Sequence, residues 1–364
     1  MRGKEVIKSI FDRKPINNGF WLGNPTVKAK ENYLSYYGIS EDELTDIDKK
    51  NLNSSVLTEE KIGHADIMLA KELKSDLMWL SPELDLSAWQ HPEGKPMFDV
   101  LGGKKRHSLG DAGIFAETEN VADVEKFDWP NVDYLDFSNT IKNVDEANAN
   151  GLAVLGGMWC PFFHIACDFF GMENYFMKMH TNPDVVLAVT EHIVDFYLQA
   201  NKKCFDQMAD KLTDSFFGND LGSQLSCLVS PAFFDKFIKP FAKKLIDQMK
   251  SYHLPVQMHS CGAIFDLIPS MIEIGVDALH PLQAKATNMD AEKLAKEFKN
   301  DIIFVGGVDT QDLLPFGNPQ QIRDEVRRLR DVFGENYIVS PSHEALLENV
   351  CIENVMAMSE AATE

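Results

Sequence analysis

Apolar and polar positions follow a regular rhythm from about residue 150 onward. Short apolar runs alternate with longer stretches whose apolar positions recur at helical spacing. The apolar runs, typical of buried strands, are 152–159, 212–220, 254–262, 276–282, 302–308 and 337–343. The helical stretches are 161–179, 183–208, 230–252, 263–274, 289–299, 319–333 and 349–361. Strands that alternate with helices predict parallel βαβ units.

The first 150 residues are less regular. Their pattern predicts helices at 6–13 and 59–73 and strands at 19–23 and 76–80. Short strands and turns at 87–119 indicate a β-hairpin insertion over one end of the fold. Because no Pro-, Gly- or Ser-rich linker interrupts the chain, we expect residues 1–364 to form a single domain with an irregular N-terminal extension.

The βαβ rhythm fits both a doubly wound sheet and a closed barrel. No Gly-x-Gly-x-x-Gly motif follows a predicted strand and no Walker loop is present, which argues against a nucleotide-binding sheet. The net charge of −21 disfavours nucleic acids and anionic membranes as partners. A charged N-terminus, the lack of a long apolar run and six scattered cysteines predict a cytoplasmic protein with free thiols.

The sharpest chemical signal is His259-Ser260-Cys261-Gly262, at the end of a predicted strand. Residues i and i+2 of a strand point to the same side, so His259 and Cys261 offer an imidazole and a thiolate to one point. Zinc suits such a pair, and a catalytic zinc site needs a third protein ligand. His343, at the end of the last strand, is the first candidate for that ligand, and Asp220 and Glu344 are alternatives. The competing interpretation is two ordinary buried side chains.

Other candidate site residues surround this pair in the predicted fold. Asp220 and Gln224 lie in a glycine-containing loop, where they either orient a substrate or serve the turn itself. Trp21, Asn24, Trp159 and Phe162 are candidates for the wall of an apolar pocket. Most members of the aromatic cluster Trp159, Phe162, Phe163, Phe169 and Phe170 are expected to pack in the core instead.

Four segments between 150 and 360 resemble, in order, the uroporphyrinogen decarboxylase superfamily. They are GGMWCPFFHIACDFFGMENYFMKM, SPAFFDKFIKPFAKKLIDQMK with PVQMHSCG, GGVDTQDLLPFGNPQQIRDEVRRL, and SPSHEALLENVCIENV. The resemblance implies a (β/α)8 TIM barrel whose cleft lies at the carboxyl ends of the strands. The decarboxylases' arginine-rich segment is replaced here by FWLGNP, and their Phe-Ser-Asp segment by LSPE, with Pro82 and Glu83. The likeness therefore favours the metal-dependent methyltransferase branch.

That branch binds zinc through a His-x-Cys pair and a late Cys, near which His343 stands in this sequence. The resemblance implies methyl transfer between a small molecule, either a methyl ether as in O-demethylases or a thiol, and the cobalamin of a separate corrinoid protein. Asp220 or Glu344 would complete the coordination or orient the substrate. A second copy of the chain is a further partner left open. The alternatives are a metal-free decarboxylase-like lyase acting on a porphyrin-type or other carboxylate, and a barrel that only binds a corrinoid protein.

Overall fold

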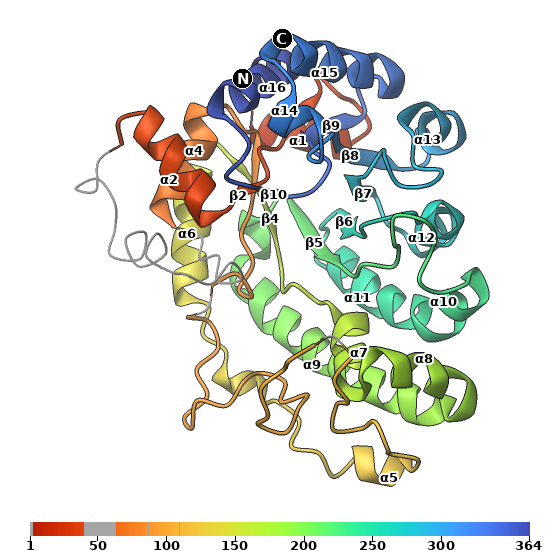
Figure 1. Ribbon diagram of the computed structural model, residues 1–364. Coiled ribbons are helices and arrows are strands. Elements are labelled where there is room, and N and C mark those ends of the chain that lie inside the picture. The colour runs from red at the N-terminus through yellow and green to blue at the C-terminus, as the bar shows by residue number, and fades with distance from the viewer. Residues whose placement is uncertain (1–2, 40–62, 86, 109) are drawn as a thin grey trace.

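A parallel sheet of eight strands curves into a barrel and carries its helices on the outside (Figure 1). The computed structural model describes residues 3–39, 63–85, 87–108 and 110–364. The strands run in the order β1-β9-β8-β7-β6-β5-β4-β3. Their bounds are β1 (Gly19–Phe20), β3 (Leu77–Trp79), β4 (Ala153–Gly156), β5 (Asp214–Gly218), β6 (Val256–His259), β7 (Ala278–Leu282), β8 (Ile303–Val308) and β9 (Tyr337–Pro341). This sequential order is that of the predicted α/β barrel and differs from the doubly wound alternative.

Helices follow most strands, and most of the helices pack against the outer face of the barrel. Those of the N-terminal part are α1 (Lys4–Phe11), α2 (Val27–Tyr36), α4 (His64–Glu72), α5 (Val121–Val124) and α6 (Ser138–Ala149). The later ones are α7 (Phe162–Phe170), α8 (Met172–Thr181), α9 (Pro183–Met208), α10 (Pro231–Phe237), α11 (Lys239–Ser251), α12 (Ile268–Ile274), α13 (Ala291–Phe298), α14 (Leu313–Phe316), α15 (Pro319–Phe333) and α16 (Ile352–Thr363). Short 3-10 turns lie at Val132–Tyr134, Ala209–Lys211 and Phe265–Leu267.

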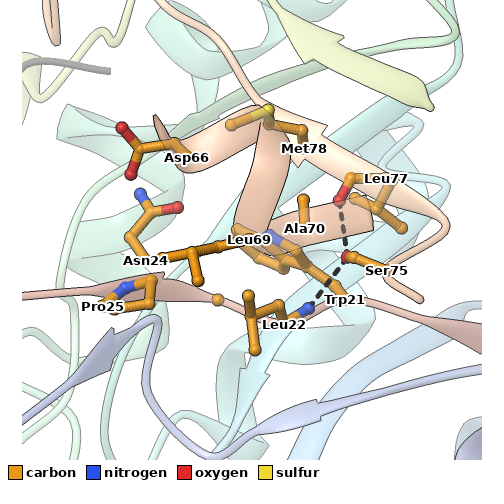
Figure 2. A pocket seen from close by; sticks show the side chains of 11 residues that line it. Trp21, Leu22, Asn24, Pro25, Asp66, Leu69, Ala70, Ser75, Leu77 and Met78 are labelled. Atoms are coloured by element: carbon orange, nitrogen blue, oxygen red, sulfur yellow. Dashed lines mark hydrogen bonds between the residues drawn. The ribbon is translucent and has the colours of Figure 1, made fainter. Parts of the chain in front are cut away.

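Side chains close the seam where the two end strands of the sheet, β1 and β3, meet. The backbone N–H of Asp76 donates to the carbonyl of Phe20 at 2.8 Å. Its carboxylate accepts the N–H of Phe20 at 2.9 Å in return. Figure 2 shows Ser75 linking Leu22 to Leu77, with its hydroxyl 3.1 Å from the N–H of Leu22. The barrel is therefore nearly closed, with a short seam in place of a full ladder.

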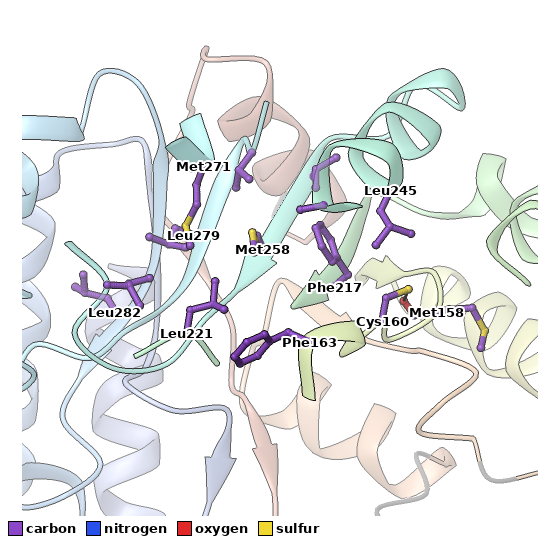
Figure 3. Packing of buried hydrophobic residues seen from close by; sticks show 14 of the residues in the cluster. Met158, Cys160, Phe163, Phe217, Leu221, Leu245, Met258, Met271, Leu279 and Leu282 are labelled. Carbon is purple, nitrogen blue, oxygen red and sulfur yellow. Dashed lines mark hydrogen bonds between the residues drawn. The ribbon is translucent and has the colours of Figure 1, made fainter. Parts of the chain in front are cut away.

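The apolar core has an inner and an outer part. Inside the barrel, residues of alternate strand positions such as Trp21, Trp79 and Phe216 pack together, and α1 covers the end from which the strands start. Outward-facing residues such as Phe217 and Met258 pack against the surrounding helices (Figure 3). This two-sided burial explains why the strands read as continuous apolar runs in the sequence.

Several predicted helices are divided by single residues. The stretch 161–179 breaks at Gly171, whose φ of 81° ends α7 before α8 begins. The stretch 230–252 breaks at Ile238, because Pro240 has no N–H to donate and its ring would clash with the carbonyl four residues earlier in a continuous helix. The expected helix 183–208 is confirmed as α9, although the side chain of Asn182 makes no capping hydrogen bond.

The β-hairpin expected at 87–119 is wrong for the described residues of that segment. They form turns and loops, with one isolated bridge between Trp89 and Leu135. The segment lies beside α9, where Trp89 and Phe98 contact Phe196, at the end of the molecule that carries α5 (Figure 1). Of the helix expected at 59–73, positions 59–62 lie outside the described residues and the rest forms α4. A second, small parallel pair joins β2 (Asn24–Pro25) to β10 (Ala345–Leu346).

No helix in the described part of the chain is both long and apolar enough to span a membrane.

Candidate metal centre at the barrel mouth

Three donor groups meet where β5 and β6 end. His259 is the last residue of β6, Cys261 follows it by two positions, and Asp220 follows β5 by two positions. His259 Nε2 lies 3.0 Å from Asp220 Oδ1 and 3.3 Å from Cys261 Sγ. One atom from each of the three residues falls within 4.8 Å of the others. The expected convergence of His259 and Cys261 is therefore present, and a carboxylate joins them.

Two glycines allow the loops that carry these donors to touch. A Cβ added at Gly222 would lie 2.7 Å from the backbone nitrogen of Ala263 and 2.9 Å from the carbonyl oxygen of Cys261. A Cβ added at Gly262 would lie 2.4 Å from the carbonyl carbon of Gly222. Only residues without a side chain permit this approach, which fixes the loop after β5 against the loop after β6.

Gly222→Ala is expected to separate the two loops and to lower zinc affinity by about 10-fold or more, with a loss of about 1–3 kcal/mol in stability. The reason is that its methyl group meets backbone atoms, which cannot turn aside as a flexible side chain does. Zinc titration and urea unfolding would measure the two effects. Gly110→Ala is the matched control, because its Cβ would meet only the Ser108 hydroxyl at 3.7 Å. Wild-type zinc affinity in Gly222→Ala would contradict the expectation.

The backbone around Asp220 is anchored from two neighbouring elements. Its N–H donates to His164 Nε2 on α7 at 2.8 Å. Burial lowers the pKa of His164, so the ring is neutral and its Nε2 serves as the acceptor. The N–H of Leu221 donates to the hydroxyl of Ser260 at 3.1 Å. The Asp220 loop is thus held in place before any ligand arrives.

His280 of β7 supports His259 from inside the barrel. The two Nδ1 atoms lie 3.0 Å apart, and His280 is fully buried. Burial, with the neighbouring His259 and His343 rings, holds the pKa of His280 well below its usual range, so its ring is neutral. We assign the hydrogen bond accordingly, with His259 Nδ1–H donating to His280 Nδ1. This assignment directs His259 Nε2 toward Asp220 and Cys261, as a ligating histidine requires.

Glu344 adds a second carboxylate to the inner side of the group. Its Oε2 lies 3.8 Å from His259 Nδ1 and is buried without a hydrogen-bond partner among the described residues. Atoms of His259, His280 and Glu344 also fall within 4.8 Å of one another. A buried oxygen with no donor is costly. Glu344 therefore approaches the Nδ1 atom of His259, whereas Asp220 and Cys261 approach the Nε2 atom.

The protonation states of the group are strongly coupled. Burial alone would raise the pKa of the Asp220 carboxyl, but its hydrogen bonds to His259 and to the N–H of Cys261 hold the pKa below its usual range. Burial opposes a charged His259, yet Cys261, Glu344 and Asp220 raise the pKa of the imidazole. Burial also raises the pKa of the Cys261 thiol. A metal ion would displace the protons of His259 and Cys261, so its binding is expected to tighten as pH rises.

His280→Leu is expected to lower zinc affinity by about 10- to 100-fold, because it removes the acceptor that orients His259. His280→Gln offers a side-chain acceptor again and should restore part of the loss. Competition with a chromogenic chelator would measure the affinities. His180→Leu, on the exposed face of α8, is the control and should behave as wild type. Equal affinity in wild type and His280→Leu would refute the assigned hydrogen bond.

His343 lies outside both groups of donor atoms. Its Nδ1 accepts the backbone N–H of Ala345 at 3.1 Å and lies 3.6 Å from Glu344 Oε2. Its ring is 40% exposed. The donor atom that lies beside His259 and Cys261 therefore belongs to Asp220. In the sequence analysis Asp220 was an alternative to His343, the first candidate.

The expected substrate-contacting residues fall into two groups. Trp159 and Gln224 lie at the mouth: the Trp159 ring centroid is 5.4 Å from that of His259, and Gln224 is exposed. Trp21 is buried inside the barrel against His280 instead, with ring centroids 4.6 Å apart. Phe162 is fully buried and packs on Phe241. Asn24, half-buried, lines a small hollow near the seam (Figure 2).

A half-buried acid, Glu83, lies in the loop that follows β3. Glu83 keeps part of its side chain exposed, but its Oε1 is buried without a partner among the described residues. Burial raises the pKa of Glu83 to about 8, against a hydrogen bond from Tyr197 that lowers it. The group is thus a neutral carboxylic acid at lower pH and is separate from the donor group at β5 and β6.

Residues 111–364 match the uroporphyrinogen decarboxylase family, and the chain belongs to it. Its relatives include the methylcobamide:CoM methyltransferase MtbA of Methanosarcina mazei, 26% identical over 52% of this chain and 53% of that protein. The methylated-thiol–coenzyme M methyltransferase of the same organism is 25% identical over 45% of this chain and 41% of that protein. The chain thus spans about half the length of these relatives, or less.

The fold is also that of a known methyltransferase. A solved structure described as a methyltransferase from Methanosarcina mazei covers 100% of this chain and 98% of its own, with a TM-score of 0.64 at 15% identity. At this identity the likeness establishes the barrel alone. The sequence relatives make the chain a distant relative of methyltransferases within its family.

Proposed function

We propose that this protein is a zinc-dependent methyltransferase that moves a methyl group between a small molecule, a methyl ether or a thiol, and the corrinoid of a separate protein. The observation that carries the proposal is the convergence of Asp220, His259 and Cys261 at the barrel mouth. Two relatives add support, since their names describe methyl transfer involving a methylcobamide, coenzyme M or a methylated thiol.

The donor set fits zinc better than other common ions. An imidazole nitrogen, a thiolate and a carboxylate oxygen are the three ligand types of protein zinc sites. Magnesium and calcium prefer oxygen ligands alone. Three protein ligands would leave a position open for a substrate or a water molecule. When bound, zinc supplies Lewis acidity that favours a thiolate or an alkoxide at neutral pH.

The residues of this chain have separate tasks in the proposed reaction. His259, oriented by His280, and Cys261 would hold the metal, with Asp220 as the charged oxygen ligand. Trp159 stands edge-on beside His259 and would limit the approach of water from one side. Glu344 would orient the substrate or accept a proton from it.

Metal content gives the first test. Protein loaded with zinc and then dialysed is expected to keep about one zinc per chain, and His259→Ala and Cys261→Ala are expected to lose it. Cys227→Ala is the matched control, because its thiol donates to the carbonyl of Ala263 at 3.2 Å and lies outside the donor group. Methyl transfer from methylcobalamin to a thiol, assayed on the loaded protein, then tests the activity.

Protein that cannot retain zinc would contradict the proposal. The alternative hypothesis, a metal-free carboxy-lyase of the same family, would then be tested with carboxylate substrates in place of methyl donors.

A further inference from the structure

A cavity of about 470 Å³ opens beside the donor group, between the loops that follow β5, β7, β8 and β9. Its polar lining is made of amide and hydroxyl side chains: Gln224, Gln283, Thr310, Gln311, Ser342 and Asn349. Leu347 and Val350 add an apolar wall. Such a volume holds a small organic molecule.

The cavity is joined to the metal group through shared contacts. Gln283 Oε1 accepts the N–H of Gly262, next to Cys261, at 2.9 Å, and the side-chain amide of Gln224 at 3.2 Å. His343 and Ala345, the neighbours of Glu344 in sequence, both line the cavity. A ligand seated there would therefore lie next to the proposed metal position.

The described lining residues include no lysine, arginine, aspartate or glutamate. The one titratable ring in the lining, His343, uses its Nδ1 to accept a backbone N–H. Lys285 follows Gln283 closely in the chain, but its ammonium group is paired with Asp309 at 2.9 Å and with Asp312. An anion entering the cavity would lose hydration without gaining a cationic partner.

We propose that this cavity binds the neutral, hydroxyl- or amide-bearing part of the methyl donor or acceptor, and that this chain selects a neutral small molecule over an anionic thiol such as coenzyme M. The inference rests on the proposed function and specifies its substrate class. Amide and hydroxyl side chains both donate and accept hydrogen bonds, which suits alcohol and amide groups. The net charge of −21 acts in the same direction by repelling anions.

Two thiols that differ at one end test the proposal. They are 2-mercaptoethanol, which is neutral, and 2-mercaptoethanesulfonate, which is coenzyme M. Calorimetric titration of the zinc-loaded protein is expected to show at least about 10-fold tighter binding of the neutral thiol, because both share the zinc-seeking sulfur and only the other end meets the cavity. Equal binding, tighter binding of the sulfonate, or no binding of either would overturn the proposal.

A charge added to the cavity sharpens the test. Gln311→Arg places a cation in the lining and is expected to shift the preference toward the sulfonate by about 10-fold or more. Gln207→Arg, on the exposed end of α9, adds the same charge elsewhere and should leave the preference as in wild type. An unchanged preference in Gln311→Arg would count against the cavity as the binding place. Failure of the proposed function is distinct, since it appears as loss of zinc before any thiol is added.

Discussion

Asp220→Asn is expected to weaken zinc binding by at least about 100-fold, while His343→Ala leaves it within a few-fold of wild type. The asparagine keeps the size of the side chain and an oxygen that can still accept the N–H of Cys261, now 3.0 Å away. What it removes is the negative charge and one strong ligand. His343 is spared because its Nδ1 is used by the backbone of Ala345.

Zinc affinities of the two variants, measured by chelator competition, would decide between the carboxylate and the second histidine as the third ligand. Circular dichroism of the metal-free proteins shows whether the variants are folded. A large loss in His343→Ala together with a small loss in Asp220→Asn would reverse the assignment. His343, the first candidate from the sequence, would then be the third ligand.

Glu83→Gln is expected to stabilise the protein as pH rises from about 5 to 8. The pKa of Glu83 is about 8 in the fold against an ordinary value of 4.5. Between these values the unfolded chain releases the proton and the folded chain keeps it, so the wild type loses stability with rising pH. The lost stability near pH 8 is on the order of a few kcal/mol, because the half-buried carboxyl is partly screened by solvent. Glutamine mimics the neutral acid and removes this dependence.

Urea unfolding of both proteins at several pH values, at fixed metal content, would measure the difference. The gap between Glu83→Gln and wild type should widen steadily with pH and then level off above pH 8. Glu93→Gln serves as the control because the Glu93 side chain is 71% exposed. The difference in unfolding free energy between this variant and wild type should not change with pH. If the unfolding free energies of wild type and Glu83→Gln change with pH in parallel, the Glu83 carboxyl is solvated in the folded protein.

The barrel itself was predictable because burial on both sides leaves a clear mark on parallel strands. Runs such as 302–308 hold apolar residues or glycine at every position, and the intervening helices carry a polar face. The segment 87–119 was not predictable in the same way. Its aromatic and polar residues suggested strands, yet without a partner ladder they settle as turns against α9.

The site was predictable where it depends on local geometry and missed where it depends on the fold. His259 and Cys261 share a face because strands alternate with period two. His280 becomes their support only through the register of β6 and β7, which pairs His259 with His280. A histidine at an inward position of an otherwise apolar strand was the available signal. His164 gave none, because helix α7 brings it to Asp220 only in three dimensions.

The three donor residues and most of the cavity lining come from different loops of the barrel. Asp220, His259 and Cys261 all belong to the β5 and β6 ends, and the glycine contact between those loops keeps them in register. Most of the cavity's polar lining comes from the loops after β7, β8 and β9. Substitutions in the cavity can therefore change which molecule fits there without moving Asp220, His259 or Cys261.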